Sequence, residues 1–164
     1  MRGNAEYVNL IQGQALTVNG KTVISDSLPV GEGWYRMNLR IGLVFVVGTG
    51  TTPITEGELH FIKNVLFKTD RGEIICNLPG KALYKIATFK AGLVTPRKDA
   101  IAAASATYYV NLPIYFSDHY RTMDRPEDTI LHTKRYSSMT IEIQLGTVAD
   151  LLSTVGTSSV TATL

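Results

Sequence analysis

The sequence has little of what disulfide-rich, membrane-spanning or disordered proteins depend on. Its one cysteine, Cys76, leaves no partner for a disulfide within the chain and no cluster for a zinc site. The longest apolar run, residues 41–47, is strand-sized and far shorter than the ~18 residues of a membrane-spanning helix. Charged residues make up only 18% of the 164 residues and the net charge is +2, so composition predicts neither disorder nor nucleic-acid binding.

Recognisable catalytic and ligand-binding motifs are also missing. His60, His119 and His132 lie in different segments, and none has a partner at the short spacings that place two metal ligands on one face. Cys76 lies in an expected strand, where it is typical of a small buried apolar residue. The glycine-rich residues 48–53 lack the spacing and the lysine of a phosphate-binding loop. We therefore expect no enzymatic activity, no catalytic residue, no metal and no cofactor.

Aromatic and basic residues do not form a continuous surface in the sequence. Tyr108 and Tyr109 are adjacent in an expected strand and would point to opposite faces, while basic pairs occur at residues 97–98 and 134–135. Single-stranded nucleic acids need aromatic side chains and cations on one face. We expect no direct binding to nucleic acid.

Threonine and alternating apolar residues are abundant instead, and they predict an almost entirely β protein. The expected strands are residues 34–47, 65–69, 73–77, 107–116, 136–145 and 160–164. Gly72 fits the turn of a hairpin between the second and third of these. Gly42 is expected to bend or bulge the long strand where it passes into a sheet covered on both faces, and Pro113 predicts a sheet edge.

Helical patterns are few. Pro79 fits a first helical turn, and an apolar stripe predicts a helix of about three turns over residues 79–89. Thr55 and Glu58 match a capping box that would start a short helical turn, and residues 148–152 predict another turn.

The strand over residues 136–145 allows each side chain to be assigned to a face. Period-two alternation predicts a core face made of Met139, Ile141, Ile143 and Leu145. Glu142 would then point outward or into a subunit contact, together with Gln144.

Several segments together resemble the coat-protein barrels of tailless icosahedral viruses with an internal membrane. They are residues 34–47, 58–68, 78–84, 111–116, 128–136 and 139–146. Their order is similar to the first barrel of a double jelly-roll major capsid protein of a bacteriophage, or to a single jelly-roll coat protein of that lineage. The resemblance implies an all-β fold, an antiparallel jelly-roll β-sandwich or barrel with one short inserted helix.

The length matches one barrel. We expect residues 1–164 to form a single jelly-roll domain. The alternating run that stops at Leu164 favours the N-terminal part of a longer chain over a single jelly-roll coat protein.

The resemblance implies a viral structural protein, a major capsid subunit that self-assembles into an icosahedral shell through trimeric capsomers. Its partners would be itself, other capsid proteins and an internal membrane beneath the shell. It would be made in the host cytoplasm and reside in the capsid of the virion. The alternative is a β-sandwich binding module for carbohydrate or a receptor, for which Trp34 is the candidate platform. A cupin-type enzyme would need paired histidines, and their spacing here argues against it.

Two long stretches without clear secondary structure, residues 92–106 and 117–133, are candidates for subunit contacts. Long loops in compact domains are usually functional or disordered, and complementary charge sets the register between subunits. The candidate interface residues are Arg97, Lys98, Asp118, Arg121, Asp124 and Arg125.

Overall fold

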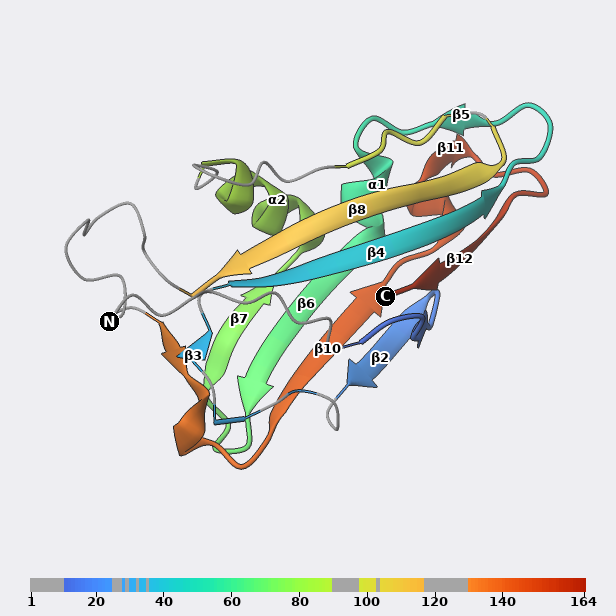
Figure 1. The fold of residues 1–164 in the computed structure, drawn as a ribbon. Coiled ribbons are helices and arrows are strands. Elements are labelled where there is room, and N and C mark those ends of the chain that lie inside the picture. Colours follow the sequence, from blue (N-terminus) through green and yellow to red (C-terminus); the bar gives the residue numbers. More distant parts are fainter. Residues whose placement is uncertain are drawn as a thin grey trace.

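Two four-stranded antiparallel sheets face each other across a shared apolar core (Figure 1). The computed structural model describes residues 11–24, 28, 30–31, 33–34, 36–89, 98–102, 104–116 and 130–164. Sheet A has the order β1-β12-β4-β8, formed by Ala15–Leu16, Ser159–Thr163, Arg36–Val46 and Ala106–Tyr115. Sheet B has the order β2-β10-β6-β7, formed by Gly20–Ile24, Met139–Leu145, Ile62–Thr69 and Ile74–Leu78.

Smaller elements connect these strands. Two short pairs, β3 with β9 and β5 with β11, comprise Gly33–Trp34, Leu131–His132, Thr52–Pro53 and Leu152–Thr154. The α-helices are α1, Gly57–Phe61, and α2, Gly80–Phe89, and two single 3-10 turns cover Thr133–Arg135 and Val148–Asp150.

The eight sheet strands pair as one long hairpin that has been rolled up. In chain order the first strand pairs with the last (β1·β12), the second with the seventh (β2·β10), the third with the sixth (β4·β8) and the fourth with the fifth (β6·β7). Two further pairings, β12·β4 and β10·β6, join these pairs into the two sheets. Nested antiparallel pairing in a double sheet is the jelly-roll topology, so the expected fold class is confirmed.

The strand β10 confirms the predicted alternation. Met139, Ile141, Ile143 and Leu145 are all buried in the core between the sheets. Gln144 is exposed and Glu142 lies on the outer face. The hairpin between β6 and β7 is also confirmed, with Gly72 at a φ of 78° that favours glycine.

The long strand β4 differs from the prediction at Gly42. Its pairing with β8 runs from Arg36 to Phe45 without a register shift, so the expectation of a bulge at Gly42 is wrong. A Cβ at Gly42 would lie 3.3 Å from the ring of Tyr109 and 3.2 Å from the Thr163 hydroxyl, so glycine accommodates side chains of the neighbouring strands. The strand is not covered on both faces beyond this point either, because Val44 and Val46 are exposed.

The short helix α1 forms where it was expected, but not by the expected capping box. Its N-cap is Glu56, at a left-handed φ of 58°, and no side chain caps the helix. Glu58 is buried and bonds Lys98 instead. A capping box occurs at the later predicted turn, between Thr147 and Asp150.

The helix α2 confirms the second helical prediction and packs beside β8, β6 and α1. In Figure 1 it lies at the side of the sandwich where β7 and β8 end their sheets. Pro113 lies in β8, an edge strand of sheet A, as predicted.

Candidate assembly surface

An open groove lined mostly by apolar residues runs along the side of the sandwich between the edge strands β7 and β8. It has a volume of about 380 Å³ and is lined by residues 74–78 of β7, 113–115 of β8, and Leu83 and Ile86 of α2. A second hollow of about 250 Å³ continues it and shares Ile75, Ile114 and Tyr115 with it. None of the described residues that line either hollow is charged.

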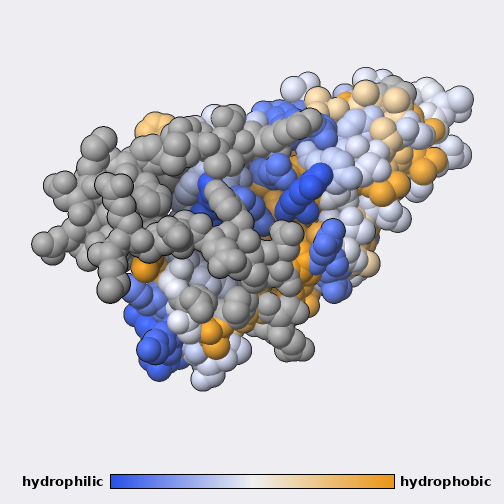
Figure 2. Space-filling model, viewed as in Figure 1, coloured by the Kyte–Doolittle hydropathy of each residue, from blue (hydrophilic) through white to orange (hydrophobic). Residues whose placement is uncertain are grey.

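Exposed apolar side chains lie on β7 and α2, two of the elements that line this groove. Phe89, the last residue of α2, is 94% exposed, and Ile74, the first residue of β7, is 62% exposed. Ile86 of α2, which lines the groove, is exposed as well. In Figure 2 apolar surface lies among strongly hydrophilic residues on the face shown. Together with the groove, these exposed side chains make this side of the sandwich the candidate surface for an interaction.

Cys76 lines the groove without being reactive. Its Sγ lies 3.9 Å from the carbonyl oxygen of Val65. Burial raises the pKa of the thiol to about 11, so it is protonated at neutral pH. The prediction that Cys76 acts as a small buried apolar residue is confirmed.

The segment after α2 is anchored by an ion pair. Lys98 Nζ lies 2.5 Å from Glu58 Oε1 of α1 and 5.9 Å from the centre of the Tyr84 ring. Desolvation opposes the charged form of Lys98, but the hydrogen bond and the charge of Glu58 outweigh it and raise the lysine's pKa. Because the Lys98 side chain is only 19% exposed, most of it is turned into its own subunit.

Lys98 and Asp99 also cover part of the outer edge of β8. The backbone N–H of Asp99 donates to the Tyr109 carbonyl, and the backbone N–H of Tyr109 donates to the Asp99 carboxylate. Each donor lies 2.9 Å from its acceptor. The Tyr108 hydroxyl donates to the Ala104 carbonyl over 2.9 Å. Tyr108 is buried and Tyr109 exposed, which confirms their opposite faces.

Only one of the predicted interface residues can be placed. Lys98 is described and bonds Glu58. Arg97, Asp118, Arg121, Asp124 and Arg125 lie outside the described residues, and their role in subunit contacts stays a prediction.

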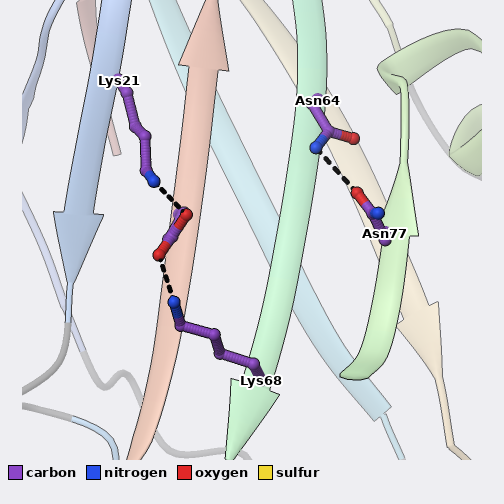
Figure 3. A network of polar contacts seen from close by, with 5 residues as sticks. Lys21, Asn64, Lys68 and Asn77 are labelled. Carbon is purple, nitrogen blue, oxygen red and sulfur yellow. Dashed lines mark hydrogen bonds and ion pairs between the residues drawn. The ribbon is translucent and has the colours of Figure 1, made fainter. Parts of the chain in front are cut away.

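The outer face of sheet B carries a charged ladder across three strands (Figure 3). Glu142 of β10 bonds Lys21 of β2 and, over 2.6 Å, Lys68 of β6. Hydrogen bonds from Lys21 and Lys68 outweigh desolvation and lower the pKa of Glu142. Beside this ladder the Asn64 side-chain amide donates to Asn77 over 2.8 Å. Lys21 and Lys68 were not singled out from the sequence, because their meeting at Glu142 depends on which strands are neighbours.

Trp34 is no open platform for a sugar. Its ring stacks on Phe67 at a centroid distance of 6.2 Å and an interplanar angle of 14°, and Phe116 lies at 6.2 Å on a tilt. The ring is partly buried against the core. The packing of Trp34 therefore argues against the alternative of a carbohydrate-binding or receptor-binding module, which rested on this residue.

The described residues offer no group of three or more His, Cys, Asp or Glu side chains arranged to hold a metal ion. His60 lies 3.3 Å from the amine of Lys81, and His119 is outside the described residues. Within the described part of the chain, no helix is long and apolar enough to cross a membrane.

Sequence reasoning missed the residues that make the groove a candidate site. Phe89 ends the apolar stripe of α2, and such stripes usually pack into a core. Ile74 follows the predicted hairpin turn and carried no signal of exposure. The uncharged composition of residues 74–78 was the only feature of the sequence that pointed to the groove.

Comparison with known proteins supports the fold. No family model matches the sequence, and no curated protein matches it. The crystal structure of the STIV MCP, the major capsid protein of Sulfolobus Turreted Icosahedral Virus, matches 93% of the chain with a TM-score of 0.58 and 13% identity. The atomic structure of that virus matches 93% of the chain with a TM-score of 0.53 and 11% identity.

The chain shares its fold with a viral capsid protein. It spans 43% and 42% of the two STIV chains, respectively. At these identities the likeness concerns the path of the backbone.

Proposed function

We propose that this protein is a structural subunit of a viral capsid that self-assembles into an icosahedral shell. The observation that carries the proposal is the match of 93% of the chain to 43% of the STIV MCP chain.

The surface supports a role in assembly. The helix α2 exposes Phe89 and Ile86, and Ile86 lines an uncharged groove together with exposed Ile74 of β7. Such surface is normal where subunits pack side by side. We propose a structural rather than an enzymatic role.

The finer assignment follows the sequence resemblance. We propose trimeric capsomers, contacts with other capsid proteins and with an internal membrane, and a location in the virion after synthesis in the host cytoplasm. We also propose a bacteriophage origin and that residues 1–164 form a single barrel, the first of two in a longer subunit. The share of the STIV chains that this chain spans, under one half, supports the two-barrel arrangement.

The test of the function is assembly of the intact protein. Mass measurement in solution should show trimers or larger species, and electron microscopy should show shells or capsomers. A protein that stays monomeric at all concentrations, and that is absent from purified virions, would contradict the proposal.

The predicted loop contacts have their own test. Arg121→Glu combined with Arg125→Glu should reduce the yield of trimers or particles, because reversed charges oppose their partners across a subunit rim. Arg71→Glu combined with Lys134→Glu is the matched control, since both cations are exposed and outside the two candidate loops. Equal assembly of the two double variants would remove Arg121 and Arg125 from the interface.

A further inference from the structure

Within the described part of the chain, no strand pairs with the outer edge of either terminal strand of sheet B, whereas an edge of sheet A is partly covered. Among the described residues β7 pairs only with β6, and β2 pairs only with β10. Each edge strand exposes a β-branched side chain, Ile74 at 62% and Val23 at 54%. In sheet A, by contrast, β8 contains Pro113 and is partly covered by residues 98–99.

Open edges are uncommon in proteins that remain monomeric. Charged side chains, prolines or covering segments normally protect an edge strand from pairing with another chain. The five residues of β7 include no charge and no proline. The one charge of β2, Lys21, bonds Glu142 in its own sheet.

The number of strands sets the direction in which copies can join. All neighbours in the order β2-β10-β6-β7 are antiparallel, so the two edge strands of this four-stranded sheet run in opposite directions. Rotation about an axis along the strands preserves strand direction. A second copy related by such a rotation therefore presents its β2 antiparallel to β7 of the first, as hydrogen bonding in an antiparallel ladder requires. Both strands have five residues.

The groove beside β7 gives this edge room for a partner's side chains. It is lined by the same strand and by no charged residue among those described. Strand addition gains affinity from backbone hydrogen bonds and specificity from pockets that take alternate side chains. The partner strand should therefore carry no charge, or only a charge that is already paired within its own sheet. Strand β2 meets this condition, because Lys21 pairs with Glu142.

We propose that neighbouring copies of this chain join edge to edge through sheet B, with β7 of one copy paired antiparallel to β2 of the next. The inference rests on the proposed assembly function and names the strands through which neighbouring subunits make contact. The contact is head to tail, since each copy uses two different edges. Head-to-tail contacts close into rings when the rotation permits, which accords with the trimer proposed above.

The test places a lysine on either edge of the intact protein. Ile74→Lys and Val23→Lys each add the residue that natural edge strands use to prevent pairing. Both side chains are more than half exposed, so the fold should persist, as circular dichroism will show. Each variant alone should associate about tenfold more weakly or worse, as expected for a central contact. Val44→Lys, at an exposed position of β4 in sheet A, is the matched control and should assemble normally.

Mixing the two variants distinguishes the geometry. A copy with Ile74→Lys retains a usable β2, and a copy with Val23→Lys retains a usable β7, so the mixture should form one-to-one dimers and nothing larger. Native mass spectrometry with one variant carrying a mass tag measures this directly.

Other outcomes overturn the junction. If Ile74→Lys blocks assembly and Val23→Lys does not, β7 pairs with a second β7 and the head-to-tail contact is wrong. If both variants form trimers or shells like the native protein, sheet B is not the junction, while the capsid function stands. If the native protein never associates, the capsid function and the junction fail together.

Discussion

Glu58 and Lys98, forty positions apart in the sequence, form an ion pair of 2.5 Å in which the glutamate side chain is 1% exposed. The pair fastens the segment before β8 to the helix α1. Both of its side chains are less exposed than those of the Lys63–Asp150 and Lys81–Glu56 ion pairs. A buried pair of this kind has a large cost when only one partner is removed.

Removing one partner of that pair should therefore destabilise the protein strongly. Lys98→Met leaves the Glu58 carboxylate buried and uncompensated, and we expect a loss of about 3–5 kcal/mol in the free energy of unfolding. Adding Glu58→Leu should recover most of the loss. The control Lys81→Met breaks the exposed Lys81–Glu56 pair of 3.2 Å and should cost about 1 kcal/mol or less. Urea denaturation measures all three, and equal losses for Lys98→Met and Lys81→Met would contradict the assignment.

The core face of β10 gives a second prediction. Ile143 is fully buried, so Ile143→Ala should reduce the free energy of unfolding by about 2–5 kcal/mol through lost burial and a residual cavity. Gln144→Ala, at the next and exposed position, should change it by about 0.5 kcal/mol or less. Chemical denaturation of the two variants compares the faces. A larger effect at Gln144 would mean that the register is wrong.

The charged ladder of sheet B should make stability depend on acid pH. Because its lysine partners lower the pKa of Glu142 below the usual 4.5, the folded state binds the proton less readily than the unfolded chain does. The stabilisation is complete above pH 4.5 and is lost as the pH falls through the lower folded pKa. Glu142→Gln should be less stable than the native protein at pH 7 and should lose less stability on acidification. Unfolding curves between pH 7 and acid conditions test this, and an unchanged slope in the variant would exclude Glu142 as the source.

The start of α2 has no room for a side chain. A Cβ at Gly80 would lie 2.7 Å from the Cβ of Ile62 and 3.0 Å from the carbonyl oxygen of Leu59. Gly80→Ala should therefore cost about 1–3 kcal/mol by overpacking, although alanine favours helix. Lys85→Ala, at an exposed position of the same helix, should leave the melting temperature nearly unchanged. A stabilised Gly80→Ala protein would mean that α1 and α2 separate more readily than their packing indicates.

Phe89 should matter for assembly and not for folding. Phe89→Ser removes a side chain that is 94% exposed, so the free energy of unfolding should change by about 0.5 kcal/mol or less. Association of the intact protein should weaken, because the apolar surface beside the groove is reduced. Thr88→Ser is the control on the same helix turn. Sedimentation measures association, and native-like assembly of Phe89→Ser would remove α2 from the contact surface.

Local pattern was sufficient for much of the fold because strand and helix periods report burial directly. The alternation of Ile141 and Ile143 determined the faces of β10, and Pro113 marked an edge strand. Gly42 was misread because the reason for glycine lies in Tyr109 and Thr163, which are distant in the sequence and adjacent only across the folded sheet.

The candidate site was less accessible to sequence reasoning. Charge in a long segment indicated Lys98 as a contact residue, yet most of its side chain lies inside the subunit against Glu58. Phe89 belongs to a helical stripe in which Leu83 and Ala87 are buried but Ile86 is exposed. Periodicity alone does not show where the neighbouring strands stop covering the helix. Both depend on what lies opposite the side chain, which is a property of the tertiary structure.

The place of β12 in sheet A has a consequence for biosynthesis. This last strand of the sequence lies between β1 and β4, and the described residues give β1 no other strand partner. During translation, which adds about 5–20 residues per second, β1 and one edge of β4 must wait until residue 163 has left the ribosome. Pairings between such distant parts of a chain form slowly. A nascent chain therefore presents an unpaired edge of β4, and conditions that prolong this interval, such as slow translation of the codons for residues 159–163, should favour aggregation over assembly.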